Sequence, residues 1–358
     1  MDILRRPAFS IVIAFVCSVV YGWIRPEKMQ AVMELWGVLV ILVLVFAIHE
    51  LGHVVFGLLN GLQFKFMTAG PITIQKEEGK IRIRENKMWG YFGGIAMLLP
   101  PSFYTPNLSK KWAWTTLGGP ITSLVCGLLA GYIYMVSYYQ SFLYFSILHF
   151  VIFLATAIPM KGIMPSDGYQ FLILVKGDEK AHQHLHSIQV SSELLSSKRP
   201  KDWDNEIVEI SKENIKNNED VGETMSDLML VFYSKCDREG MEKGITCLER
   251  VLQIPVTKAN KYFVGSFHSW YLLYKALYDM DDVSLHEMKQ HAQAITKLDL
   301  HGYYRTHAIL KYLEKDTESF HTYMKKAEKE LKNAEKSGIG CLQLEREWFE
   351  LLQKKLVI

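Results

Sequence analysis

Long uncharged runs dominate the first half of the chain. Two of them cover residues 7–24 and 112–160, and a third, residues 35–64, has Glu50 as its only formal charge. A helix needs about 20 apolar residues to cross roughly 30 Å of bilayer hydrocarbon. The longest run divides into two helices around residues 138–141. We therefore expect four membrane spans, at about residues 7–24, 36–59, 112–137 and 142–160.

Two segments between the second and third spans are not expected to cross the membrane. In residues 64–84, isoleucines alternate with polar residues on both sides of Glu78-Gly79, which is typical of a β-hairpin. Residues 88–109 are uncharged, but glycines and prolines interrupt them. A re-entrant or interfacial loop is expected there, with protein shielding its backbone from lipid.

The second half of the chain is polar, and its apolar positions recur at helical spacing. Leu228 and Phe232 show this spacing, as do Leu248 and Leu252. Paired helices of about 34 residues suggest degenerate tetratricopeptide-like repeats, with a plain helical bundle as the alternative. The predicted fold is mainly α: a multipass transmembrane helical bundle with a small β-hairpin in residues 1–177, then an all-α soluble domain in residues 178–358.

Charge and cysteine content narrow the function classes. Residues 1–177 hold 14 Lys and Arg against 8 Asp and Glu, whereas residues 178–358 hold 26 against 30. This composition excludes a disordered chain, a collagen and a small disulfide scaffold. No basic run dominates, which argues against nucleic-acid binding. Five cysteines without a C-x-x-C pair argue against a disulfide framework and a cysteine zinc site.

The loop charges predict an orientation in the membrane. Arg5 and Arg6 precede the first span, and most other basic residues of this half lie between the second and third spans. The positive-inside rule places both regions in the cytoplasm. We therefore expect a multipass protein of the cell membrane with both termini in the cytoplasm.

The candidate chemistry lies in the sequence His49-Glu50-Leu51-Gly52-His53, inside the second span. Residues i and i+4 share a helix face, so both imidazoles can bind one metal ion. Two imidazoles suit zinc, and the neighbouring glutamate can act as general base on a zinc-activated water. Burying these groups in a span is costly unless they are paired or bind metal. The alternative is a polar cluster that joins helices.

The third ligand is expected to be Asp167. It is the only acidic residue between Glu85 and Asp178, and Pro165 and Gly168 break the helix around it. The alternative is a capping aspartate at a helix start. Its isolation within the apolar half favours the role of ligand.

Together these motifs resemble the site-2 proteases, which are zinc intramembrane metalloproteases. The resemblance covers roughly residues 35–175 and rests on H-E-x-x-H in a span, Gly118-Gly119-Pro120 in a later span, and the Pro165 to Gly168 segment, in that order. It implies one Zn²⁺ per chain, bound by His49, His53 and Asp167. It also implies that Glu50 is the general base and that the substrate is a membrane-associated protein or peptide.

The chain departs from the family pattern at two positions. An asparagine often follows the Gly-Gly-Pro proline by three residues, where this chain has Ser123. Another commonly precedes the aspartate segment, where residues 155–159 read Ala-Thr-Ala-Ile-Pro. Thr122, Ser123 or Thr156 could substitute, but none is expected to be catalytic.

Several alternatives stay open at this stage. The helical domain could select the substrate or bind a cytoplasmic protein or peptide regulator. The chain could instead be a catalytically silent scaffold with the same fold, or a metal transporter. His182 and His186 share a helix face and could bind metal, although a solvated helix surface is commoner. His149, in the fourth span, is expected to pack, with contact to the site as the alternative.

Overall fold

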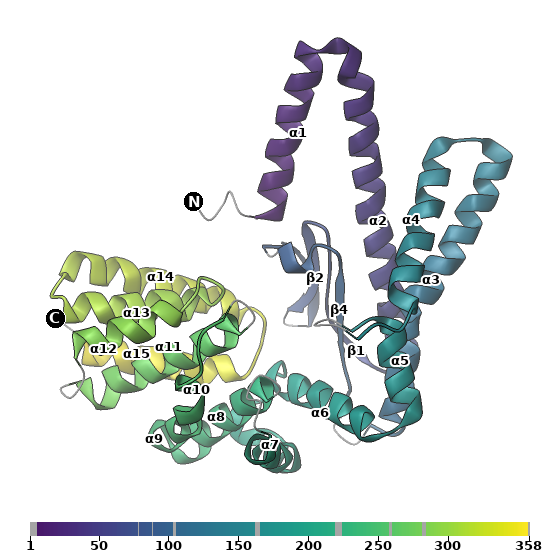
Figure 1. The fold of residues 1–358 in the computed structure, drawn as a ribbon. Helices are drawn as coiled ribbons and strands as arrows, with labels where there is room; N and C mark the ends of the chain where they lie inside the picture. The colour runs from purple at the N-terminus through teal and green to yellow at the C-terminus, as the bar shows by residue number, and fades with distance from the viewer. Residues whose placement is uncertain are drawn as a thin grey trace. The chain divides into compact units, whose positions relative to one another are not determined.

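The computed structural model describes residues 6–356, except 78, 88, 103–104, 162–164, 219–223, 258–259 and 281–283. The chain divides into two compact units, Met1–Leu185 and His186–Ile358. Figure 1 shows the helices and strands of both units.

Four helices of the first unit are long and apolar enough to cross a membrane, which matches the number of spans predicted from the sequence. The second begins earlier than expected, because the helix continues through the polar residues before Leu35. A further short helix, α5, follows the fourth. The five helices are α1 (Pro7–Ile24), α2 (Met29–Leu59), α3 (Leu108–Ser137), α4 (Gln140–Ala157) and α5 (Asp167–Lys176), with a 3-10 turn at Pro26–Lys28.

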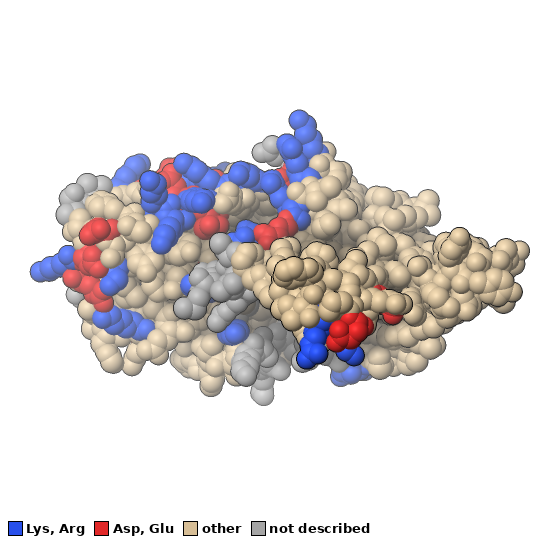
Figure 2. Space-filling view, turned by 90° about the horizontal axis from the view of Figure 1, so that it is seen from above, with Lys and Arg blue, Asp and Glu red and all other residues tan. Residues whose placement is uncertain are grey.

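The outer faces of these helices are apolar and exposed. Val40 on α2, Leu128 on α3 and Val151 on α4 are each more than half exposed. In the space-filling view, large tan surfaces without charged side chains extend at the right, over these helices (Figure 2). Such faces suit contact with lipid rather than with water.

Small residues bring α2 and α3 into backbone contact. A Cβ atom at Gly52 would lie 2.5 Å from the carbonyl oxygen of Gly118, and one at Gly118 would lie 2.5 Å from that of Gly52. Only glycine fits at such a crossing, which is a common way for membrane helices to pack. The crossing places the His49–His53 face of α2 directly against α3.

A four-stranded antiparallel sheet stands beside α2. Its strands are β1 (Gln63–Ala69), β2 (Ile72–Glu77), β3 (Lys80–Glu85) and β4 (Ile95–Leu99), in the order β3-β2-β1-β4. The predicted hairpin is confirmed as β2 (Ile72–Glu77) and β3 (Lys80–Glu85), with Ile74 opposite Ile83. Glu78, in its turn, lies outside the described residues.

The interpretation of residues 88–109 as a loop throughout was wrong. Ile95–Leu99 forms strand β4, which pairs with β1 (Gln63–Ala69). The glycines and prolines of this segment flank the five-residue apolar run and do not interrupt it, and β1 supplies its hydrogen-bonding partner. β4 is therefore an edge strand.

The second unit is a closed helical bundle. Glu345 on α15 accepts hydrogen bonds from Tyr233 Oη at 2.8 Å, Trp270 Nε1 at 2.6 Å and Arg305 Nη1 at 2.5 Å. These partners come from three other helices. The helices are α6 (Glu179–Leu194), which begins in the first unit, α7 (Asn205–Asn217), α8 (Met225–Glu239), α9 (Met241–Ile245), α10 (Glu249–Leu252), α11 (Lys261–Tyr278), α12 (Leu285–Ala294), α13 (Leu300–Leu313), α14 (Thr317–Glu335) and α15 (Cys341–Lys355), with 3-10 turns at Pro200–Asp202 and Thr246–Leu248.

Contacts between the two ends of this unit close it. The N–H of Gly340 donates to the carbonyl of Ser196 at 2.8 Å. Arg199 pairs with Asp237 on α8 and with Glu347 on α15. In a solenoid each repeat contacts only its neighbours. The last helix here reaches α8, α11 and α13, so the contacts fit the bundle alternative better than an open array of repeats.

Candidate metal centre

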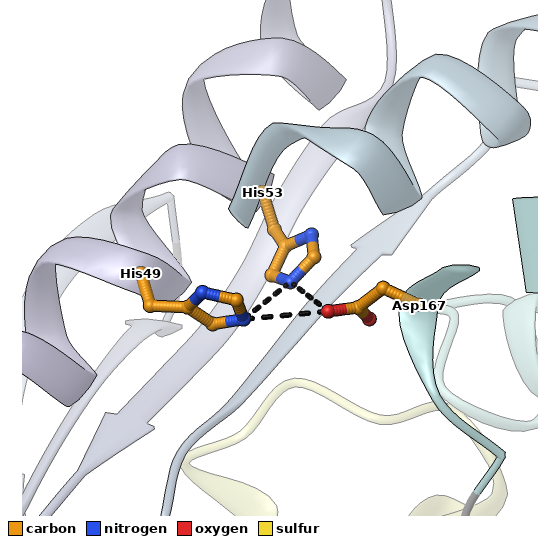
Figure 3. A group of neighbouring side chains, drawn as sticks. All are labelled: His49, His53 and Asp167. Carbon is orange, nitrogen blue, oxygen red and sulfur yellow. Dashed lines mark hydrogen bonds and ion pairs between the residues drawn. The ribbon is translucent and has the colours of Figure 1, made fainter. Parts of the chain in front are cut away.

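Three side chains from two helices converge inside the first unit. His49 and His53 lie one turn apart on α2, and both are buried. Asp167 is the first residue of α5. The two Nε2 atoms are 3.3 Å apart, and Oδ2 of Asp167 lies 3.3 Å from Nε2 of His49 and 3.4 Å from that of His53 (Figure 3).

The far side of each imidazole is held by α3. Nδ1 of His53 lies 2.9 Å from the carbonyl oxygen of Thr115. A carbonyl only accepts, and this contact is shorter than the 3.3 Å between the same nitrogen and the Gly119 amide. We therefore place the ring proton on Nδ1, which leaves the Nε2 lone pair facing Asp167. Nδ1 of His49 lies 3.0 Å from Oγ of the fully buried Ser123. Metal-binding histidines are usually oriented by such partners.

The chemistry and size of the group fit zinc. Two imidazoles and a carboxylate are ligands that zinc prefers, with bonds of about 2.0–2.1 Å, so a tetrahedral ion separates its ligand atoms by about 3.3–3.4 Å. The measured separations have that size. Among the described residues, these three form the group of His, Cys, Asp or Glu side chains able to hold a metal ion.

The space in front of the donor atoms depends on a glycine. A Cβ atom at Gly119 on α3 would lie 2.3 Å from Nε2 of His53 and 2.7 Å from Nε2 of His49. Any larger residue would therefore fill the position toward which the three donors converge.

Asp167 does not cap its own helix. The N-cap of α5 is Ser166, whose Oγ accepts the N–H of Tyr169 at 3.3 Å. The capping alternative for Asp167 is therefore wrong, and its carboxylate is turned toward the two histidines (Figure 3).

The sequence model of peptidase family M50 matches residues 37–341, most of the chain. The protein belongs to peptidase family M50. This is the site-2 protease family of membrane metalloproteases, so the resemblance seen in the motifs is confirmed and extends beyond residue 175. Searches of curated proteins and of solved structures found no match.

In this M50 protein, Glu50 lies next to His49 in the sequence and close to the donor triangle. Its side chain is buried and interacts electrostatically with His53 and Asp167. The backbone of Gly94, just before β4, covers it: a Cβ atom there would lie 2.4 Å from Oε1 of Glu50. Gly94 has a φ of +114°, which favours glycine. Sequence reasoning missed this contact, although the Gly93-Gly94 pair before an apolar run was its visible signal.

The substitutes considered for the family asparagines lie in different places. Ser123 stands behind His49, where it supports a ligand. Thr122 packs at the helix crossing, within 2.5 Å of a Cβ atom placed at Gly52. Thr156 Oγ1 donates to Ile152 in its own helix at 3.0 Å. Thr115, which orients His53, had no signal in the sequence.

The remaining histidines do not join the centre. His149 is fully buried and packs edge-on against Phe145, with ring centroids 4.5 Å apart. His186 Nε2 lies 2.6 Å from Oδ1 of Asp227, whereas His182 is exposed. In the described contacts, His182 and His186 therefore do not face a common position where both could bind one metal ion.

Proposed function

We propose that the protein is an intramembrane zinc metalloendopeptidase in which His49, His53 and Asp167 bind one Zn²⁺ and Glu50 is the general base. The observation that carries the proposal is the triangle of donor atoms, 3.3–3.4 Å on each side, built on a helix apolar enough to cross a membrane. Membership of the M50 family supports the same chemistry.

The residues divide the catalytic work among them. A zinc ion bound here would supply a Lewis acid that acidifies water and polarises a carbonyl group. Glu50 takes the proton from the attacking water and passes it to the leaving amine of the cleaved peptide. Thr115 and Ser123 keep the imidazoles turned with Nε2 toward the centre. Burial of all these groups keeps their charges poorly screened and therefore effective.

The substrate is a membrane-associated protein or peptide that binds in an extended form, since a helix hides its carbonyl groups. Among the described residues, the sheet has two free edges, one at β3 and the other at β4. The β4 edge suits the role better, because Gly94 at its start touches Glu50. A peptide can add to such an edge by main-chain hydrogen bonds.

The two parts of the chain take different roles in this proposal. Residues 1–177 form the protease domain in the cell membrane, with both termini in the cytoplasm. Residues 178–358 form a cytoplasmic domain that selects the substrate or binds a protein or peptide regulator.

Replacing Glu50 with Gln tests the mechanism. Glu50→Gln keeps the three ligands, so the purified protein should retain about one zinc per chain. It should lose at least ~100-fold in kcat/KM, because the general base is gone. Zinc content by mass spectrometry and cleavage of membrane-associated candidate substrates are the measurements. Glu34→Gln, on the same helix, is the matched control and should change neither.

Asp167→Asn tests the ligand set, because asparagine has nearly the same size as aspartate but no negative charge. It removes the only anionic ligand, so zinc content should fall markedly. Normal zinc in this variant would show that the third ligand lies elsewhere. A Glu50→Gln protein with full cellular effect would instead support the silent-scaffold alternative.

A further inference from the structure

The third donor atom reaches the candidate centre by a different route from the first two. His49 and His53 belong to one continuous helix, so helix geometry sets their spacing. Asp167 begins a separate helix, α5. Its position relative to the histidines therefore depends on the contacts that hold the start of α5.

Ser166 makes those contacts through one hydroxyl group. Its Oγ donates to the carbonyl oxygen of Ile158 at 2.7 Å and accepts the N–H of Met160 at 2.9 Å. It also accepts the N–H of Tyr169 at 3.3 Å. A hydroxyl offers one donor and two acceptor positions, so the backbone occupies all three.

Helix capping explains only the bond to Tyr169. The other two bonds run to residues that directly follow α4, and the Ser166 N–H adds a fourth contact, to the carbonyl of Met160 at 3.1 Å. Gly168 seats the same turn closely: a Cβ atom there would lie 2.0 Å from the carbonyl oxygen of Ala157. The end of α4 and the start of α5 are thus joined on both sides of Asp167.

We propose that Ser166 is a positioning residue that holds Asp167 against His49 and His53, an inference that rests on the proposed zinc site. Without the hydroxyl, the backbone groups of Ile158 and Met160 lose their partner and the start of α5 is released. Metal binding then has to order the Asp167 carboxylate, and this cost lowers the affinity for the metal. Changes behind a metal ligand typically lower metal affinity about 10- to 100-fold.

Zinc affinity of the full-length protein in detergent tests the inference, measured by competition with a chromophoric chelator. Ser166→Ala should bind zinc about 10- to 100-fold more weakly. Ser166→Thr keeps the hydroxyl and should restore most of the affinity. Ser284→Ala is the matched control, because Ser284 caps α12 by accepting the N–H of Glu287 at 3.2 Å. It should bind zinc normally.

A double-mutant cycle separates positioning from general destabilisation. If Ser166 acts through Asp167, adding Ser166→Ala to Asp167→Asn should cause almost no further loss of zinc affinity. An equal loss in both backgrounds, or unchanged affinity in Ser166→Ala alone, would overturn the inference. If Ser166→Ala yields no folded protein, Ser166→Cys keeps the volume with weak hydrogen bonding and carries the same expectations.

The same measurements distinguish failure of this inference from failure of the proposed function. Weakened zinc binding in Asp167→Asn together with normal binding in Ser166→Ala overturns only the role of Ser166. Normal binding in Asp167→Asn overturns the ligand set, and with it the role assigned to Ser166.

Discussion

Single glycines set the distances around the candidate metal centre. A Cβ atom at Gly119 would enter the space between the imidazoles, and one at Gly94 would collide with Glu50. A third, Gly52, lets α2 approach α3 closely enough for His53 to reach Thr115. At this scale the absence of a side chain matters as much as the ligands themselves.

Gly119→Ala should abolish most zinc binding while the protein still folds. The added Cβ atom lies 2.3 Å from Nε2 of His53, so the imidazoles must move apart or the metal position is filled. We expect at least a ~10-fold loss of zinc affinity, similar to the loss of an orienting partner. Gly37→Ala is the control, because a Cβ atom there has no neighbour within 4 Å. Normal zinc content in Gly119→Ala would contradict the proposed coordination.

Gly94→Ala should separate catalysis from metal binding. Its Cβ atom would lie 2.4 Å from Oε1 of Glu50, and alanine disfavours a φ of +114°. Displacing the base should lower kcat by ~10-fold or more, with zinc content unchanged. Gly93→Ala, at the adjacent position, has no neighbour within 4 Å of its Cβ atom and serves as the control. Loss of zinc in Gly94→Ala would show that this loop supports the ligands.

At the scale of elements, buried polar groups hold the helices of the second unit in one arrangement. Burial alone would raise the pKa of Glu345, but the charges of Arg305 and His301 and the hydrogen bonds from Tyr233 and Arg305 together outweigh it, and the pKa is lowered. The carboxylate is thus charged near neutral pH and binds α8, α11 and α13 to α15. Such networks can specify one packing among many.

The contact between α11 and α12 should make this unit less stable in mild acid. Burial lowers the pKa of His268, whose Nδ1 lies 2.6 Å from Nδ1 of His291, to about 4 from an ordinary 6.5. Between these two values only the unfolded chain takes up the proton, so stability falls as pH falls. From pH 7 to pH 5 the loss should reach about 2 kcal/mol.

Hydrogen exchange of the α11 amides at pH 7 and pH 5, corrected for intrinsic rates, measures this loss. His268→Gln cannot take up the proton and should show a smaller difference between the two pH values. His286→Gln, at an exposed position of α12, should behave as the wild type does. Equal pH dependence in all three proteins would mean that His268 is not the responsible group.

At the scale of the whole molecule, the four spans and the basic residues around them predict one orientation. Eight Lys and Arg lie between the second and third spans, and two precede the first. We expect both termini, and the helical unit, in the cytoplasm. The turn between α3 and α4 should then face outward, where Tyr139 is exposed.

Thiol labelling tests this orientation. A membrane-impermeant reagent should label Tyr139→Cys in intact cells, and Lys354→Cys only after permeabilisation. The wild-type protein measures labelling of the native cysteines. The opposite pattern would place the helical unit outside and would require revision of the proposed topology.

The sequence alone determined the features that depend on local spacing. The lengths of the uncharged runs predicted four spans, and the alternation around residue 78 predicted the hairpin. A separation of four residues placed His49 and His53 on one face of α2. Such features follow from the rise and period of regular elements, which are the same in every fold. The M50 motifs could be recognised for the same reason.

Only the tertiary structure decided which distant residues meet. Residues 95–99 form the strand β4 because they pair with β1. Gly94 contacts Glu50 only because β4 lies beside α2. Thr115 and Ser166 became supports of the site through contacts with residues in other elements. These contacts depend on how closely helices cross and on where each element ends. Spacing along the chain does not encode those quantities, because packing between elements sets them.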